Sequence, residues 1–147
     1  MPLRILGLDV GEKTIGVAVS DPLGWTAQGV GVIRRDRPEG HVTAELKKLV
    51  QDYQVELIVV GLPRNMNGTL GRQGQMVLDF AHQIGAELGL PVETWDERLS
   101  TASAERILLA ADVSRAKRKK IIDKMAAAVI LQNYLDSRNK KLQNGEN

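Results

Sequence analysis

The chain has 147 residues and a formal net charge of +2, and its length is that of one domain with a hydrophobic core. With 43% hydrophobic and 26% charged residues it has a globular composition, and its sequence contains neither a secretory signal nor an apolar run long enough to span a bilayer. The absence of cysteine excludes disulfides, thiolate metal sites and a cysteine nucleophile, and it fits the reducing cytoplasm, where we expect the protein to reside.

The stretch from Leu3 to Asp21 predicts a β-hairpin whose first strand ends near a carboxylate. Aliphatic residues alternate or cluster on both sides of the turn Gly11-Glu12-Lys13, which is the composition of two short strands. Asp9 therefore lies at the end of the first strand. Aspartate and glycine beside a turn are also ordinary turn chemistry, so this stretch alone does not establish a site.

The remaining chain predicts a mixed sheet flanked by helices. Glycine, proline and asparagine separate the expected elements, and the loop after the fourth strand has the position at which open α/β sheets bind ligands. We expect the following elements: a third antiparallel strand at 29–33, a helix at 42–53, a buried strand at 57–61, the loop at 61–69, a helix ending at Leu88, a strand at 91–95, a helix from 100 to about 111, a basic link at 115–120, a helix at 121–135 and a disordered polar and basic tail at 139–147, which leaves a single domain at 1–138.

The predicted arrangement brings three acidic residues together as a candidate site. Asp9 ends the first strand, and Glu97 follows the last strand at the same edge of the sheet. Asp123 lies on an apolar face of the final helix, because its helical neighbours at i+3, i+4, i+7, i+8 and i+11 are Ala126, Ala127, Ile130, Leu131 and Tyr134. An inward-facing carboxylate is costly unless it is paired or binds a metal.

The donor set favours a hard divalent cation. Three carboxylates close together repel one another unless a cation compensates, and oxygen ligands without cysteine or histidine favour Mg²⁺ or Mn²⁺. Two such ions can activate a water and stabilise the leaving oxygen in phosphodiester hydrolysis. We therefore expect Asp9, Glu97 and Asp123 to be metal ligands and catalytic residues of a nuclease.

Basic residues are concentrated near the C-terminus. Residues 115–141 contain nine lysines and arginines against two aspartates, a local charge of +7. A polyanion such as nucleic acid is a natural partner for this surface, although a solvated helix face is the ordinary alternative. The candidate phosphate-contacting residues are Lys13, Arg64, Arg98, Lys117, Arg118, Lys119 and Lys120.

Four motifs in order resemble the YqgF family, also called RuvX, over nearly the whole chain. They are Asp9-x-Gly11-x-x-x-Ile15-Gly16-x-Ala18-x-Ser20-Asp21, then Val60-Gly61-Leu62-Pro63 with Asn67-Gly68, then Asp96-Glu97-Arg98-Leu99-Ser100-Thr101, then Asp123-x-x-Ala126-Ala127 with Ile130-Leu131 and Tyr134-Leu135. The resemblance implies an RNase H-like fold related to the RuvC resolvases. It also implies a metal-dependent nuclease that processes the 5′ end of pre-16S ribosomal RNA in ribosome biogenesis, or alternatively a Holliday junction resolvase.

The family's acidic positions fall on Asp9, Glu97 and Asp123. RNase H-like nucleases often have a fourth acid, for which Asp96 and Asp21 are both candidates. The resemblance implies structured RNA, a ribosomal precursor or branched DNA as partners, and a monomer or a homodimer. A junction resolvase would require a two-fold dimer, because it cuts two strands symmetrically.

Two other classes of function stay open. Asp-x-Gly before a hairpin also resembles the first phosphate loop of actin-like ATPases, but those proteins need two such domains and 147 residues provide one. A non-catalytic nucleic-acid-binding adaptor in ribosome assembly would keep the basic surface without requiring all three acids.

Overall fold

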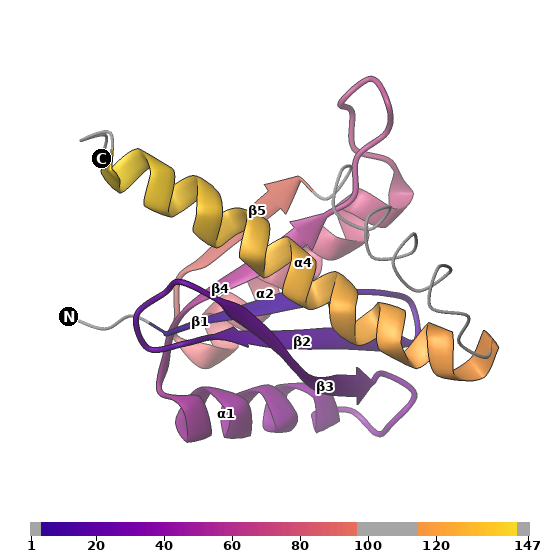
Figure 1. Ribbon diagram of the computed structural model, residues 1–147. Helices are drawn as coiled ribbons and strands as arrows, with labels where there is room; N and C mark the ends of the chain where they lie inside the picture. The colour runs from indigo at the N-terminus through magenta and orange to yellow at the C-terminus, as the bar shows by residue number, and fades with distance from the viewer. Residues whose placement is uncertain (1–3, 97–114, 144–147) are drawn as a thin grey trace.

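Five strands and three helices make up the part of the chain that the computed structural model describes, which is residues 4–96 and 115–143 (Figure 1). The strands are β1 (Arg4–Val10), β2 (Thr14–Ser20), β3 (Ala27–Arg34), β4 (Val55–Leu62) and β5 (Val92–Asp96). The helices are α1 (His41–Tyr53), α2 (Arg72–Leu88) and α4 (Arg115–Gln143). The helix predicted from residue 100 to about 111 lies outside the described residues.

The strands form one mixed sheet in the order β3-β2-β1-β4-β5. The first three strands are antiparallel, and β4 and β5 join them in parallel. This confirms the predicted sheet of three antiparallel strands followed by parallel ones. Central strands such as β4 are almost continuously apolar because both of their faces are covered.

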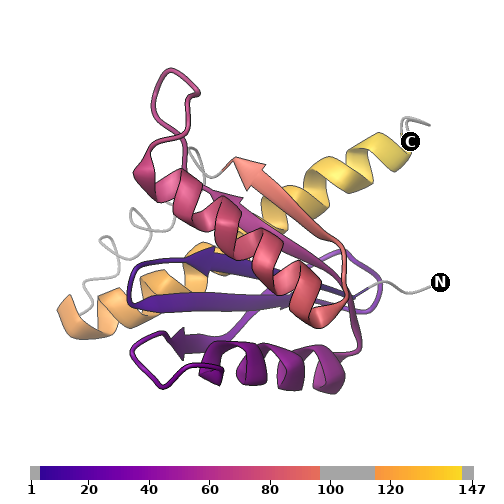
Figure 2. The same cartoon turned by 180° about the vertical axis from the view of Figure 1, so that it is seen from behind.

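Helices cover both faces of the sheet. α1 and α2 lie on one face and α4 crosses the other, as the two opposite views show (Figures 1 and 2). Each face has its own apolar core, and the alternation of side chains along the strands assigns residues to one core or the other. On β1, Leu6, Leu8 and Val10 belong to the α1/α2 core, whereas Ile5 packs with α4.

Helix α4 approaches β1 closely at Gly7. A Cβ atom on Gly7 would lie 2.8 Å from Cβ of Leu131 and 3.4 Å from the carbonyl oxygen of Ala127, so only glycine fits here without a shift. At the β2–β3 connection the Gln132 side chain accepts a hydrogen bond from the backbone N–H of Ala27 (2.9 Å) and donates one to the carbonyl oxygen of Trp25 (3.0 Å). These contacts fix where the helix crosses the sheet.

The predicted ends of this last helix are wrong. α4 begins at Arg115, so the expected basic link at 115–120 is helical, and it runs to Gln143, five residues into the expected tail. No glycine or proline interrupts residues 115–143, and lysine, arginine, alanine and leucine are good helix formers. Asn139 also ties this end of the helix to the fold, because its amide donates to the carbonyl oxygen of Gly24 (3.0 Å). None of the helices described is both long and apolar enough to cross a membrane.

Candidate active site

Asp9 lies at the carboxyl end of β1, as predicted. It pairs with Gly16 on β2, and it follows Ile5 and Gly7 on the face of the sheet that α4 covers, because side chains alternate along a strand. The residue is partly exposed. Its carboxylate is therefore placed at the edge of the sheet, on the α4 side.

Strand β5 ends at the same edge. Trp95 pairs with Gly61 of β4, the residue that follows Val60, and Val60 pairs with Leu8 of β1. Asp9 and Trp95 thus share one transverse row with a single strand between them, about 10 Å apart at the backbone. Glu97 follows the last residue of β5, and Glu97 and Arg98 themselves lie outside the described residues.

The first half of α4 lies toward the end of β1 that carries Asp9. Gln132 and Asn139 contact the β2–β3 connection, which lies at the other end of the sheet, and Ala127 passes over Gly7. Residues before Ala127 therefore continue toward the end of β1 that carries Asp9, and Figure 1 shows the orange part of α4 on the side of the sheet where β1 and β2 are joined. Asp123 lies one helical turn before Ala127, although its side chain is outside the described part of the structure.

Neither candidate for a fourth acid has a favourable position. Asp21 lies at the opposite end of β2, where its Oδ1 accepts hydrogen bonds from the backbone N–H groups of Trp25 (2.7 Å) and Thr26 (3.1 Å). Those bonds, that of Thr26 first, hold the pKa of Asp21 below its usual range. Asp96 pairs with Leu62 and follows Trp95, so strand alternation assigns it to the α1/α2 face, opposite to Asp9.

The metal centre as a whole stays a prediction. Among the described residues no three histidine, aspartate or glutamate side chains come together as a metal site. Two of the three predicted ligands, Glu97 and Asp123, have side chains outside that set. The structure places the end of β5 and the first half of α4 toward the edge of the sheet where Asp9 lies. Of the three predicted ligands it describes only the side chain of Asp9.

The predicted basic residues differ in what surrounds them. Lys13 is exposed in the turn between β1 and β2. Arg64 is exposed in the loop after β4, where its Nη1 donates to the carbonyl oxygen of Gly68 (3.0 Å), so it also supports that loop. The side chains of Lys117, Arg118, Lys119 and Lys120 lie outside the described part, although their backbone forms the first turns of α4.

Two arginines beside the β1–β2 turn, on the face of the sheet that α2 covers, were missed by the sequence analysis. Arg35 donates from Nη1 to the carbonyl oxygen of Gly11 (2.6 Å), and its guanidinium lies 5.3 Å from the centre of the Phe80 ring. Arg35 and Arg72 line a shallow depression together with Glu12, beside the turn that follows Asp9. The only signal was the charged stretch at 34–40, which gives no indication of which arginine turns toward the sheet.

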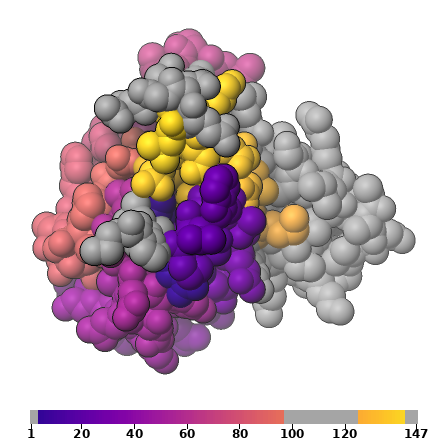
Figure 3. Space-filling view, turned by 60° about the vertical axis from the view of Figure 1, so that its left-hand side comes forward, coloured from indigo at the N-terminus to yellow at the C-terminus, as the bar shows by residue number. Residues whose placement is uncertain are grey.

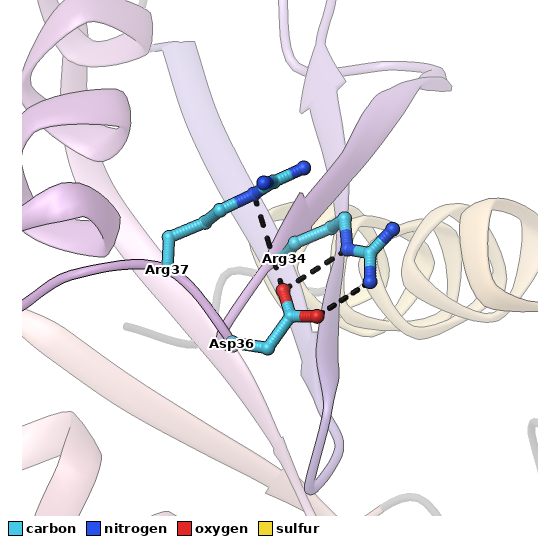
Figure 4. A network of polar contacts seen from close by, with 3 residues as sticks. All are labelled: Arg34, Asp36 and Arg37. Atoms are coloured by element: carbon cyan, nitrogen blue, oxygen red, sulfur yellow. Dashed lines mark hydrogen bonds and ion pairs between the residues drawn. The ribbon is translucent and has the colours of Figure 1, made fainter.

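The arginines on either side of Arg35 are engaged elsewhere. Arg34 forms a two-point contact with Asp36, from Nε to Oδ1 at 3.0 Å and from Nη2 to Oδ2 at 2.5 Å, and Arg37 lies 3.9 Å from the same carboxylate (Figure 4). The pKa of Asp36 is lowered by the hydrogen bond from Arg34. These three exposed residues partly neutralise one another, which leaves Arg35 as the arginine of this loop that faces the β1–β2 turn.

The loop after β4 is braced by its own polar groups. The backbone N–H of Asn65 donates to the carbonyl oxygen of Thr69 (2.9 Å), and Asn67 accepts from the Thr69 backbone N–H (3.1 Å). Gly68 has a φ of 86°, a left-handed conformation that glycine adopts without strain. The loop projects from the sheet at the end of β4 (Figures 1 and 2), with Met66 97% exposed. It is a preformed projection beside the row of Asp9.

Sequence comparison identifies relatives along almost the whole chain. A family model described as "RuvX: Holliday junction resolvase" matches residues 3–137. A protein of Desulforamulus reducens named "Putative pre-16S rRNA nuclease" is 63% identical over 135 residues, covering 92% of this chain and 98% of its own. A protein of the same name from Geobacillus thermodenitrificans is 59% identical over 137 residues, covering 92% and 99%.

Structural comparison finds the same fold in junction resolvases. RuvC of Thermus thermophilus in complex with a Holliday junction substrate aligns with a TM-score of 0.58 at 18% identity, covering 94% of this chain and 96% of RuvC. The fowlpox virus Holliday junction resolvase aligns with a TM-score of 0.54 at 13% identity, covering 92% and 99%. This likeness confirms the predicted RNase H-like fold. Given the match over residues 3–137 and relatives at 59–63% identity, the chain belongs to the RuvX family.

Proposed function

We propose that the protein is a nuclease that hydrolyses phosphodiester bonds and processes the 5′ end of pre-16S ribosomal RNA. The names of its relatives and the fold of the junction resolvases support this proposal. The observation that carries it is the convergence on Asp9: β5 ends beside it directly before Glu97, and α4 runs toward it through position 123. A ribosomal precursor as substrate would place the protein in the cytoplasm.

Asp9, Glu97 and Asp123 would hold Mg²⁺ or Mn²⁺. The fit rests on donor chemistry and placement, since Asp9 is a partly exposed carboxylate on the α4 face and the other two acids come from the elements that end or pass beside it. A bound divalent ion would activate a water and stabilise the leaving oxygen. The role of the chain itself would be to hold three oxygen donors in place before the reaction, so that the ligands need not move when the ion and the substrate bind.

The basic residues would hold the substrate backbone across this edge. Lys13 and Arg35 flank the turn after Asp9, and Arg64 is part of the projecting loop after β4. Arg98 and the residues 117–120 would extend the same surface along the chain. Contacts of this kind go to phosphate and sugar, so they position a nucleic acid without reading its sequence.

Cleavage of four-way DNA junctions is the second candidate, because the family model is described as a Holliday junction resolvase. It would require a two-fold dimer, whereas processing of an RNA end can be carried out by a monomer. A ribosome-assembly adaptor without cleavage activity is the non-enzymatic alternative. It predicts binding without metal-dependent hydrolysis.

The decisive experiment compares Asp9→Asn with the wild-type protein on pre-16S RNA and on a four-way DNA junction, each with Mg²⁺, with Mn²⁺ and with EDTA. Asp52→Asn is the matched control, since it makes the same change at an exposed residue of α1. Loss of one metal ligand should abolish cleavage while binding is kept or improved, because repulsion of phosphate falls. Asp52→Asn should cleave like the wild type.

Each result has one interpretation. Cleavage of RNA alone supports end processing, and cleavage of the junction alone supports the resolvase. If the wild-type protein binds without cleaving under any metal condition, the adaptor is favoured. If Asp9→Asn cleaves as well as the wild type, Asp9 is not a metal ligand.

A further inference from the structure

A groove lies over the outer strand β5 and the C-terminal turns of α4. It is lined by Glu93, Trp95, Tyr134, Ser137, Arg138, Lys141 and Leu142. Figure 3 views this side of the molecule and shows the last turns of α4 (yellow) next to β5 (salmon). None of the lining residues belongs to the predicted metal centre, so the function proposed above does not account for this aromatic groove.

Two aromatic rings form its wall. Trp95 and Tyr134 meet edge to face with ring centres 5.9 Å apart, which is a favourable aromatic geometry. Both side chains are partly exposed, although each belongs to the rim of the core under α4. Only 3% of the residues of this protein are aromatic, so two adjoining, partly exposed rings are a local concentration of aromatic surface.

The groove begins at the row of the sheet that contains Asp9. Trp95 pairs with Gly61, lies on the α4 face like Asp9, and is about 10 Å from it at the backbone. Gly61 lies between them and is buried, so a ligand that reaches both residues passes over the surface and not along β4 itself. The spacing of about 10 Å allows a nucleic acid whose backbone passes Asp9 to place a neighbouring base against Trp95.

The charges of the groove fit a phosphate. Arg138 and Lys141 line the side formed by α4. The acidic residue of the groove, Glu93, accepts a hydrogen bond from the Tyr134 hydroxyl, which engages its carboxylate. Aromatic rings beside cations are the combination used for unpaired nucleotides, whose bases stack while their phosphates are neutralised.

We propose that this groove binds an unpaired nucleotide of the nucleic-acid substrate adjacent to the cleavage position, with the base stacked on Trp95 and the phosphate held by Arg138 and Lys141. This inference rests on the proposed function, which supplies the nucleic acid as the substrate. A base inside a duplex has both faces covered by the neighbouring base pairs, so the groove selects substrates with a single-stranded segment beside the cut.

The test measures binding in EDTA, where no cleavage occurs, with an RNA hairpin that either carries or lacks a single-stranded extension. The extension should tighten binding by the wild-type protein about 5- to 150-fold, the range for one stacked base. Trp95→Ala should abolish that gain and leave blunt-hairpin binding unchanged, whereas Trp95→Phe should keep much of it. Trp25→Ala is the matched control, because Trp25 is 54% exposed on the β2–β3 connection.

A second measurement does not depend on how well Trp95→Ala folds. In Trp25→Phe the only tryptophan is Trp95, and its fluorescence should be quenched by the extended hairpin and not by the blunt one. The double variant Arg138→Ala/Lys141→Ala should lower the salt dependence of binding to the extended hairpin, relative to Lys47→Ala/Lys48→Ala on the opposite helical layer.

The groove proposal and the nuclease proposal can fail separately. If the extension adds no affinity, or if Trp95→Ala retains the gain, the groove does not bind a nucleotide, whatever the cleavage assays show. If the extension acts through Trp95 but the wild-type protein cleaves nothing with any metal, the groove stands and the nuclease proposal falls. Equal gains from RNA and DNA extensions would assign recognition to base and phosphate and not to the 2′-hydroxyl.

Discussion

Substitution of Gly7 by alanine tests the packing that brings α4 toward Asp9. The new Cβ would lie 2.8 Å from Cβ of Leu131, whereas non-bonded carbon atoms prefer about 3.5–4.0 Å. The helix or the strand must therefore move by roughly 1 Å. Cβ of Leu131 cannot rotate away because the helix backbone fixes its position, and the carbonyl oxygen of Ala127 at 3.4 Å is backbone; only Cδ2 of Leu131, also at 3.4 Å, can turn aside.

The expected cost follows from two opposing terms. Overpacking of a well-packed core costs about 1–3 kcal/mol, and the lower chain entropy of alanine returns about 0.5–1 kcal/mol. A net loss of about 1–2 kcal/mol should lower Tm by about 2–8 °C in a domain of this size. Because a displacement of about 1 Å in a catalytic group can cost about 100-fold in rate, cleavage should fall more than stability implies.

Gly31→Ala provides the matched control. Gly31 also lies in a strand, β3, but a Cβ there would meet no atom within 4 Å. Thermal and denaturant unfolding of the two variants should show a loss for Gly7→Ala and no loss, or a small gain, for Gly31→Ala. If both variants unfold like the wild type, α4 does not press on β1 as described, and the placement of position 123 loses its support.

Three further predictions concern residues around the sheet. Ser20→Ala should lower the free energy of unfolding by about 1–3 kcal/mol in denaturant titration, because it leaves the buried N–H of Ile5 without its 2.9 Å acceptor; an unchanged midpoint would contradict this. Asp21 has a lowered pKa, so its contribution to stability is present above about pH 4 and is lost as the pH falls through the folded pKa; Asp21→Ala should be less stable near neutrality and should show a weaker decline in Tm on acidification. Asp96→Asn should retain metal-dependent cleavage, since alternation directs it away from Asp9, and loss of cleavage would show that it is a fourth ligand.

Most of the sheet could be predicted because its signals are local. The turn at 11–13 and the apolar runs on either side determine β1 and β2, and the continuous apolar run of β4 marks a strand covered on both faces. Asp9 was placed correctly for the same reason: its position at the end of a strand depends only on residues near it in sequence.

The ends of α4 could not be predicted from the same kind of signal. The basic run at 115–120 has no apolar stripe and was interpreted as a link, yet it continues a helix that packs on the sheet from Ala126 onward. In the same way, Asn139 is polar but is held by the carbonyl oxygen of Gly24, a contact between residues far apart in the chain. Helix ends that are determined by tertiary contacts cannot be predicted from local composition.

The register of strand pairing explains why the sequence did not decide between Asp96 and Asp21 as the fourth acid. Asp96 and Asp21 are both aspartates near predicted strand ends, and the pairing of β5 with β4 and of β2 with β1 shows where each one lies relative to Asp9. A shift of one residue in register reverses the face of every side chain in a strand. The sequence does not contain that information in any local pattern, so it left the fourth acid open, and the sheet places both candidates away from Asp9.

The continuity of α4 links the two sites that we propose. The helix has 29 residues and is therefore about 43 Å long, and it crosses β1 at Gly7 near its middle. Its first half runs toward Asp9 and its last turns form one wall of the aromatic groove, so a tilt about the crossing point displaces both ends in opposite directions. Gly7→Ala should consequently weaken cleavage and the gain from a single-stranded extension together, whereas Trp95→Ala should change only the second. If Gly7→Ala weakens cleavage but not the gain from the extension, or the reverse, then α4 bends at the crossing and does not move as a rigid rod.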